Sequence, residues 1–194
     1  RGRFMSEGKF VHVRPFIPDK KGKQTDEASD TWDTADWLVK NVKNNNGRIG
    51  VVGISYPGFY STMAILSSHP AIKAVSPQAP VTNWFIGDDE HHNGAFFLMD
   101  NFSFNIGFND PMKVPTRKSN RDFTWNAEDS YEFFLRLGPI RNSKKFFADS
   151  AKFWHAVFKH PNYDAWWKAT DPRPYLTHVT PAVMTVGGWY DAED

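Results

Sequence analysis

Gly50-Val51-Val52-Gly53-Ile54-Ser55-Tyr56-Pro57-Gly58 places a serine between two segments of different periodicity. Residues 48–53 form a short apolar run, as in a strand buried on both faces of a parallel sheet. Residues 58–67 carry apolar side chains at helical spacing. A serine on a sharp turn from a strand into a helix is the pattern of a nucleophile elbow. Such a turn needs compact residues around the serine, and Gly53 and Gly58 meet that need.

The serine turn departs from the strict Gly-x-Ser-x-Gly motif at one position. Pro57 stands where the second glycine is expected, and the glycine follows one place later. Proline suits the first turn of a helix, because the N–H that it lacks has no intrahelical partner there. At an elbow the helix N-terminus favours an oxyanion, and we expect the backbone N–H of Tyr56 to be one donor. The motif alone leaves the alternative that Ser55 only caps the helix.

The segments around this turn predict an α/β fold. Ser29 or Asp30 is a candidate N-cap for a helix that runs to about Val42. Residues 71–75 and 181–186 are short apolar runs typical of buried strands, and residues 9–14 alternate as in a half-buried strand. Helix, strand, helix and strand follow one another, which favours a parallel sheet.

The middle of the chain has a different character. Residues 93–167 are rich in Phe, Trp and Asn, and residues 129–137 and 143–158 have helical patterns. We interpret this region as a mainly helical insertion. The expected division is therefore a first core segment at 1–92, a helical cap at 93–172 and a second core segment at 173–194.

Composition excludes several classes of protein. The 194 residues are 40% hydrophobic, which is enough to bury a core, and the net charge of +1 gives no general case for binding nucleic acid. No apolar run approaches the roughly 18 residues that a membrane helix needs, so we expect no membrane insertion. Cysteine is absent, which excludes disulfides and thiolate chemistry. Both ends of the chain suggest a piece of a longer protein.

Several motifs together resemble one family of serine hydrolases. This family includes cocaine esterases, X-Pro dipeptidyl peptidases, glutaryl cephalosporin acylases and α-amino acid ester hydrolases, and the last of these are the most similar. The motifs are Arg-Gly-Arg-Phe-Met-Ser-Glu-Gly at 1–8, Asp-Thr-Trp-Asp-Thr-Ala-Asp-Trp-Leu at 30–38, the serine turn, and Pro-Ala-Val-Met-Thr-Val-Gly-Gly-Trp-Tyr-Asp at 181–191. The resemblance implies an α/β-hydrolase fold with a mainly helical cap insertion, here truncated at both ends.

The resemblance also implies catalytic roles. Ser55 would be the nucleophile and Asp191 the acid that orients a histidine, in the α/β-hydrolase order Ser, Asp, His. The family's histidine follows its aspartate, so we expect it beyond Asp194, and all 7 histidines of this chain precede Asp191. The family's oxyanion-hole tyrosine is expected before Arg1. Without a general base the fragment alone should be close to inactive.

Three further acids match a carboxylate cluster that binds the substrate ammonium group in α-amino acid ester hydrolases. They are Asp89, in the context Gly87-Asp88-Asp89, and Glu193 and Asp194, which follow Asp191. Carboxylates that converge on one spot repel one another unless a cation joins them, so such a cluster suits a positively charged ligand. The alternative is that Glu193 and Asp194 are ordinary loop acids near solvent.

The resulting prediction is a serine hydrolase that cleaves esters or amides of α-amino acids, including α-amino acyl β-lactams. The substrate is a small molecule with a free α-amine, and no organic cofactor is implied. Asp88, Glu90, His91 and His92 lack a recognised metal-ligand spacing, so no metal is expected. The alternatives are an X-Pro dipeptidyl peptidase, a cephalosporin acylase or another carboxylesterase of the family, or a non-catalytic protein on a hydrolase fold. Members of this family are often exported in bacteria and often form oligomers, so the resemblance suggests a periplasmic or secreted homo-oligomer. A chain without disulfides also fits the cytoplasm.

Overall fold

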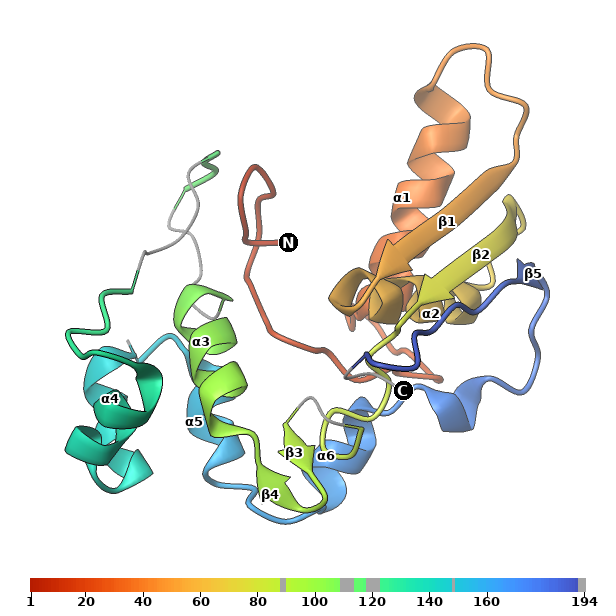
Figure 1. Ribbon diagram of the computed structural model, residues 1–194. Helices are drawn as coiled ribbons and strands as arrows, with labels where there is room; N and C mark the ends of the chain where they lie inside the picture. The colour runs from red at the N-terminus through yellow and green to blue at the C-terminus, as the bar shows by residue number, and fades with distance from the viewer. Residues whose placement is uncertain (88–89, 109–113, 118–122, 148, 192–194) are drawn as a thin grey trace. The chain divides into compact units, whose positions relative to one another are not determined.

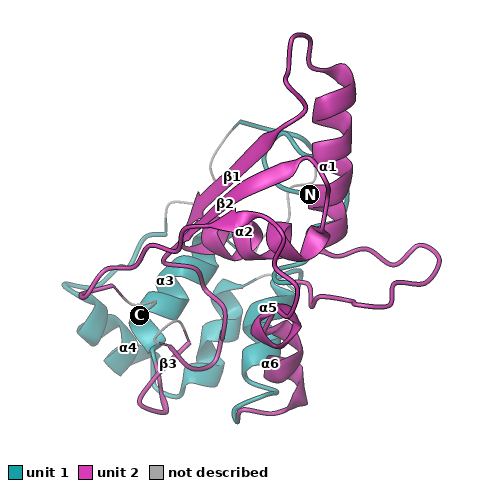
Figure 2. Ribbon diagram, turned by 90° about the vertical axis from the view of Figure 1, so that its right-hand side faces the viewer, with its two compact units in different colours: residues 1–13, 97–162 teal, residues 14–96, 163–194 magenta. Residues whose placement is uncertain are grey.

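The computed structural model describes residues 1–87, 90–108, 114–117, 123–147 and 149–191. The chain divides into two compact units, drawn in separate colours in Figure 2. One unit contains Arg14–Phe96 and Tyr163–Asp194, and the other contains Arg1–Val13 and Phe97–Asn162. The division into core and cap segments expected from the sequence concerns the whole hydrolase fold and stays a prediction.

A parallel sheet forms the centre of the unit that contains Arg14–Phe96, which is unit 2 in Figure 2 (Figure 1). Its strands are β1 (Ile49–Ile54), β2 (Ile72–Gln78) and β5 (Ala182–Val183), in the order β1-β2-β5. Val51 pairs with Val75, which pairs with Val183. A further bridge joins Gln78 to Val186, so the chain follows β2 beyond the short β5. The α/β fold with a parallel sheet, predicted from the sequence, is confirmed.

Two helices pack on one face of this sheet. They are α1 (Glu27–Asn41) and α2 (Tyr56–Ser67), and they share a buried apolar cluster with β2. The cluster contains Ala35 of α1, Ala64 and Ile65 of α2, and Ile72 and Val75 of β2. The helices therefore fix the position of β2 and of the turn that leads from β1 into α2.

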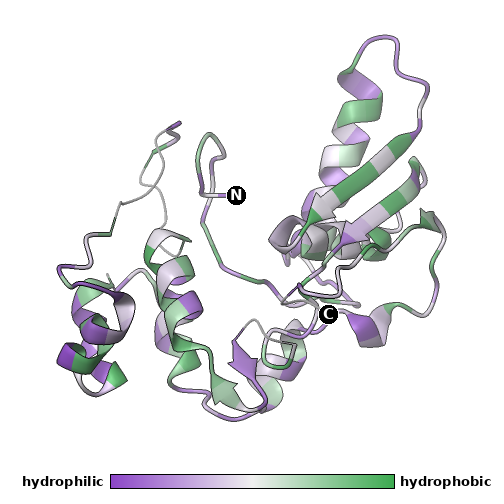
Figure 3. Ribbon diagram, in the orientation of Figure 1, coloured by the Kyte–Doolittle hydropathy of each residue, from purple (hydrophilic) through white to green (hydrophobic). Residues whose placement is uncertain are grey.

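The other face of the sheet is not covered by the residues that the structure describes. Val52 and Ile54 of β1 are 66% and 62% exposed, and Met184 beyond β5 is 62% exposed. Strand β1 nevertheless has an apolar sequence, as Figure 3 shows. The prediction that residues 48–53 are buried on both faces is therefore wrong for this chain, in which α1 and α2 cover a single face.

Helix α1 begins earlier than the sequence suggested. Its N-cap is Asp26, not Ser29 or Asp30. The Asp26 carboxylate accepts a hydrogen bond from the Ser29 N–H at 2.8 Å, and the Ser29 hydroxyl reaches back to the Asp26 N–H at 2.9 Å. The other carboxylate oxygen accepts from the Ile17 N–H and pairs with Lys20. Asp26 and Ser29 are only three residues apart, so this capping box was a local signal that the sequence analysis missed.

Short elements complete unit 2. Strands β3 (His91–His92) and β4 (Ala95–Phe96) form an antiparallel pair. The chain returns to this unit through α6 (Ala165–Thr170) and the 3₁₀ turn η2 (Arg173–Tyr175).

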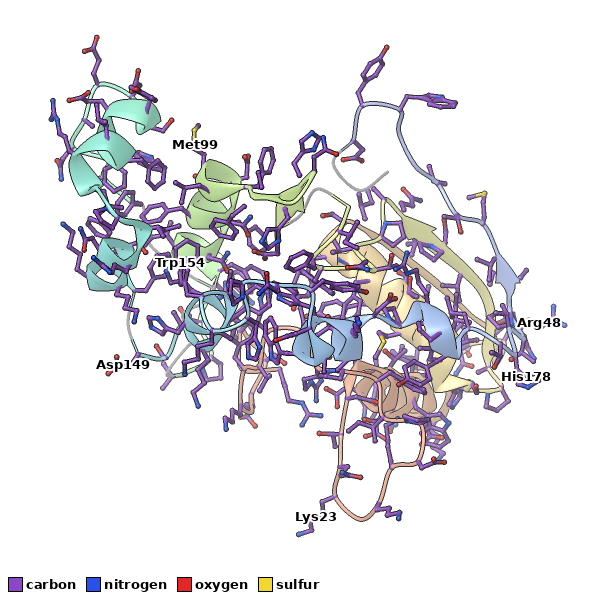
Figure 4. All side chains as sticks on the ribbon, turned by 90° about the horizontal axis from the view of Figure 1, so that it is seen from below. Lys23, Arg48, Met99, Asp149, Trp154 and His178 are labelled. Atoms are coloured by element: carbon purple, nitrogen blue, oxygen red, sulfur yellow. The ribbon has the colours of Figure 1, made fainter. Side chains whose placement is uncertain are left out.

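Unit 1 of Figure 2 is mainly helical. It contains α3 (Leu98–Phe108), α4 (Ser130–Leu137), the 3₁₀ helix η1 (Ile140–Phe146) and α5 (Lys152–Val157). The helix predicted for residues 143–158 is therefore two shorter elements. Phe102 and Trp154 are fully buried at the centre of an aromatic core, and Figure 4 shows Trp154 among crowded side chains. Rings that contact Phe102 come from Phe123, Trp125, Phe133, Phe134, Phe146, Phe147 and Trp154.

The strand predicted for residues 9–14 is absent, although this segment is described throughout. Val13 has a φ of 46°, which a strand does not allow. The His12 ring instead packs on Phe153, with ring centroids 4.0 Å apart, and on Phe108 at 5.3 Å. Packing against the aromatic residues of the helical unit therefore overrides the alternating pattern.

The buried His12 ring predicts acid sensitivity. Burial, with a smaller contribution from the Arg3 charge, lowers the pKa of His12 from 6.5 to about 3. Between these values the unfolded chain binds the proton and the folded chain does not, so stability is complete above about pH 6.5 and falls as the pH drops toward 3. We expect the His12→Phe variant to lose less stability than the wild type between pH 7 and pH 4. The expected difference in the free energy of unfolding is on the order of 3 kcal/mol. Urea unfolding at the two pH values measures it, and equal losses in both proteins would contradict the account.

Candidate active site

The backbone of Ser55 has the conformation of a nucleophile elbow. Its φ of 59° and ψ of −119° lie far from the values that a serine usually adopts. Ser55 precedes α2 directly, and Pro57 is the second residue of that helix. The Ser55 side chain makes no capping hydrogen bond to α2, so its hydroxyl does not serve as a helix cap. Strained backbone of this kind persists only where the surrounding structure enforces it, and it concentrates at functional sites.

Two glycines allow the turn to form. A Cβ added at Gly53 would lie 2.1 Å from the carbonyl oxygen of Pro57. A Cβ added at Gly58 would lie 2.6 Å from the carbonyl oxygen of Gln78. Both contacts are to backbone atoms, which cannot move aside as a flexible side chain can. The compact residues that the sequence analysis required at these positions are thus needed for steric reasons.

Backbone hydrogen bonds join the elbow to the ends of the other strands. The Ser55 N–H donates to the Gln78 carbonyl at 2.9 Å, and the Ala79 N–H donates to the Val186 carbonyl at 2.7 Å. The carboxyl ends of β1, β2 and the β5 segment therefore meet at one edge of the sheet. Ligands of open α/β sheets bind outside this edge.

Asp191 follows the same edge, in a turn beyond Val186. Its N–H donates to the Gly188 carbonyl at 3.1 Å, and the residue is exposed. Ser55 directly follows β1, and Asp191 comes five residues after the bridge at Val186, so both lie beyond the carboxyl ends of parallel strands. The three carboxylate candidates Asp89, Glu193 and Asp194 lie outside the described residues.

Tyr56 joins the elbow to the hydrophobic core. Its side chain is buried, and its ring packs edge-on against Tyr60 at 5.0 Å and Trp84 at 5.1 Å. Tyr56 is the first residue of α2, and the first N–H groups of a helix are those that can serve an external oxygen. The location suits the oxyanion donor that the sequence analysis predicted.

Comparison with known proteins identifies the family. The sequence matches X-Pro dipeptidyl-peptidases of the S15 family over residues 1–194. The chain belongs to the S15 family of serine hydrolases. It is 26% identical to the cocaine esterase of Rhodococcus sp. (strain MB1 Bresler) over 98% of its length and 32% of that protein.

Solved structures give the same result as the family match. An aminopeptidase from a marine sediment Thaumarchaeota archaeon superposes with a TM-score of 0.84 and 31% identity. An α-amino acid ester hydrolase superposes with a TM-score of 0.80 and 32% identity. Each match covers 98% of this S15 chain and 31% of the other protein. The chain therefore spans about a third of the length of its relatives.

The structure brings together residues that the sequence analysis of this S15 chain did not connect. Asn83 donates a hydrogen bond from its side-chain amide to the Tyr163 hydroxyl at 2.9 Å, although the residues are 80 positions apart. The Phe85 ring stacks on the His91 ring. Burial lowers the pKa of His91, and a hydrogen bond to the Phe85 backbone opposes this only partly. Local sequence offered one signal, an Asn of the type that starts turns.

Among the described residues, no three His, Asp or Glu side chains are grouped so that they could hold a metal ion. Within the same ranges, no helix combines the length and apolar character needed to cross a membrane.

The close backbone contact at Gly53 predicts that one added methyl group lowers the stability of the protein. Gly53→Ala places a Cβ against the Pro57 carbonyl and should cost about 2–3 kcal/mol of stability, because the obstacle is backbone. Gly50→Ala is the matched control in the same strand, since a Cβ there meets nothing within 4 Å. Its effect should stay within about 0.5 kcal/mol. Urea unfolding compares the two variants, and equal stabilities would show that the close approach is not needed.

Proposed function

We propose that Ser55 is the nucleophile of a serine hydrolase that acts on esters or amides of α-amino acids. The observation that carries this proposal is the left-handed backbone of Ser55 at the start of α2, in a chain of the S15 family. An elbow of this kind presents the hydroxyl to solvent at the edge of the sheet where ligands bind. The proposal concerns the full-length protein, because the relatives are about three times as long as this chain.

In the reaction, the Ser55 Oγ forms a bond to the acyl carbon while its proton passes to a general base. The carbonyl oxygen becomes an oxyanion, which accepts a hydrogen bond from the Tyr56 N–H. The alcohol or amine then leaves with a proton from the base. Water, or an amine such as a β-lactam nucleus, takes the acyl group from Ser55 and regenerates the hydroxyl.

The general base is a histidine that follows Asp191 and lies outside this chain. Asp191 orients it and stabilises its protonated form, as the acid does in other triads. Without that histidine, Ser55 keeps the ordinary low reactivity of a serine hydroxyl. We therefore expect residues 1–194 alone to be almost inactive.

Three carboxylates give the proposed preference for a free α-amine. Asp89, Glu193 and Asp194 would surround the substrate ammonium, which gains several kcal/mol of gross attraction from each carboxylate at about 4 Å before desolvation. Two structural relatives support this choice, since they are named as an α-amino acid ester hydrolase and an aminopeptidase. A glutaryl acyl group fits poorly, because its negative charge would be repelled.

A second candidate is an X-Pro dipeptidyl peptidase, which the description of the matching family favours. The same carboxylates would then bind the N-terminal amine of a peptide. The two candidates share Ser55 and Asp191 and differ in the length of the acyl part.

The nucleophile assignment predicts that Ser55→Ala in the full-length protein lowers kcat by about 10⁴-fold or more, because no covalent intermediate can form. Ser67→Ala is the matched control at the other end of α2, where the hydroxyl bonds the Ala64 carbonyl. It should leave kcat within about twofold. Steady-state rates on an α-amino acid ester decide the matter, and substantial activity in Ser55→Ala would disprove the mechanism.

The carboxylate assignment predicts a preference for phenylglycine methyl ester over the same ester with an acetylated amine. Each of Asp89→Asn, Glu193→Gln and Asp194→Asn should reduce the ratio of the two kcat/KM values by about tenfold, the equivalent of about 1.4 kcal/mol. Asp33→Asn on the exposed face of α1 is the control and should not change it. Equal kcat/KM values for the two esters in the wild type would mean that these three residues are ordinary surface acids and do not bind the amine.

A further inference from the structure

The ring of Tyr56 packs against a tryptophan from the segment that follows β2. Trp84 is 4% exposed, and its ring lies edge-on to Tyr56 and Phe59, with ring centroids 5.1 Å and 5.5 Å apart. Tyr56 is the first residue of α2, where the helical hydrogen-bond ladder has only begun. The orientation of its backbone N–H, the proposed oxyanion donor, therefore depends on what the Tyr56 ring packs against.

The segment that leads to Trp84 runs close against the start of α2. A Cβ added at Gly58 would lie 2.9 Å from the Cα of Pro80. Ala79 and Val81, on either side of Pro80, are buried, and the Ala79 N–H donates to the Val186 carbonyl. This segment is therefore fixed at its start, at the same edge of the sheet as the elbow.

Asn83, the residue before Trp84, fixes the turn in which Trp84 lies. Its side-chain oxygen accepts hydrogen bonds from the backbone N–H groups of Phe85 at 3.1 Å and Ile86 at 3.0 Å. Its side-chain nitrogen donates to the Tyr163 hydroxyl at 2.9 Å. These bonds set the direction of the chain on both sides of Trp84.

The partners of this turn lie at the start of α6. Asp164, the residue after Tyr163, is the N-cap of α6 and fixes the first turn of that helix. The Phe85 ring lies 5.4 Å from the Tyr163 ring and 5.3 Å from the Trp167 ring, and Trp167 is fully buried. The residues before and after Trp84 are thus both held by the same anchored part of the chain.

We propose that Trp84 is a positioning residue for acyl transfer, which holds Tyr56 and the oxyanion donor beside Ser55, and that the Asn83–Tyr163 hydrogen bond keeps Trp84 in place. This inference rests on the proposed function. Trp84 acts through Tyr56 and does not touch the reacting atoms.

The interaction that Trp84 supports is strongest in the transition state, when the carbonyl oxygen becomes an oxyanion. Loss of a whole oxyanion donor costs about 10²–10³ in kcat, so a displaced donor should cost part of that factor. Binding of the uncharged ground-state carbonyl depends little on the donor. A change at Trp84 should therefore lower kcat and kcat/KM together and hardly change KM.

The experiment measures kcat and KM of the full-length protein on an α-amino acid ester. Because Trp84→Ala leaves a buried cavity, rates are expressed per active site titrated with a fluorophosphonate, so that unfolded protein does not count. Trp84→Ala should lower kcat and kcat/KM by about tenfold, with KM within about twofold. Trp84→Phe keeps a ring against Tyr56 and should recover most of the lost rate. Trp37→Ala is the matched control on α1, where the side chain is 59% exposed, and should leave kcat unchanged.

Two further variants test the hydrogen bond that holds the turn, and they apply even if Trp84→Ala fails to fold. Tyr163→Phe removes the hydroxyl, keeps the ring and should lower kcat by about threefold. Asn83→Asp should keep most of the rate, because a carboxylate can accept from both backbone N–H groups and from the Tyr163 hydroxyl. Tyr175→Phe, at a ring that packs on Phe16, is the matched control and should leave kcat unchanged.

A boronic acid inhibitor separates a role at the oxyanion from general support of the fold. Its boron bonds to the Ser55 Oγ, whose proton passes to the general base, and the adduct is a tetrahedral anion like the reaction intermediate. Its Ki should rise in Trp84→Ala by the same factor by which kcat/KM falls, because both depend on the oxyanion donor. The affinity of the amino acid product, which has no tetrahedral centre, should change less than about twofold.

The outcomes separate this inference from the proposed function. If Ser55→Ala abolishes activity while Trp84→Ala and Tyr163→Phe keep the wild-type kcat per active site, the positioning role is wrong and the proposed function stands. A fall in kcat without a matching rise in the boronic acid Ki also overturns the inference, as does an effect confined to KM. If Ser55→Ala stays active, the proposed function and this inference both fail. Parallel changes in kcat/KM and Ki, with recovery in Trp84→Phe, support the positioning role.

Discussion

The close approach of Gly53 to the Pro57 carbonyl is the constraint on which the rest of the site depends. With Gly58 packed against the Gln78 carbonyl, it leaves room for only one path of the chain from β1 into α2. That path forces Ser55 into a left-handed backbone conformation and turns its N–H toward the end of β2. The strain is offset by the packing of α2 on β1 and β2, so the core stabilises the geometry that the chemistry needs.

The elbow and the parallel sheet were predictable from sequence because their causes are local. A small residue on each side of a serine, a short apolar run and a helical pattern lie within twenty residues of one another. The errors arise where distant partners dominate. Arg14 pairs with Glu27 and Asp30, and His12 packs among aromatic rings, so residues 9–14 do not form the alternating strand. The helix cap at Asp26 is a different case, because its capping partner Ser29 is only three residues away and the signal was present in the local sequence.

The candidate site likewise combines residues that local sequence predicts with contacts that it does not predict. Ser55, Tyr56 and Asp191 follow strand ends, which sequence periodicity can locate, whereas the Asn83–Tyr163 hydrogen bond spans 80 residues and leaves no local pattern. The turn that it anchors contains Trp84, which packs beside the elbow, and Phe85, which stacks on His91. One short stretch of chain thus contacts the residues around the proposed nucleophile.

Covalent trapping of the nucleophile tests the central claim most directly. The full-length protein would be treated with a fluorophosphonate until ester hydrolysis stops, and the modified residue would be located by mass spectrometry of its peptides. Our account predicts one phosphonyl group per chain, on Ser55. Modification of a different serine, or complete loss of activity while Ser55 stays unmodified, would contradict it.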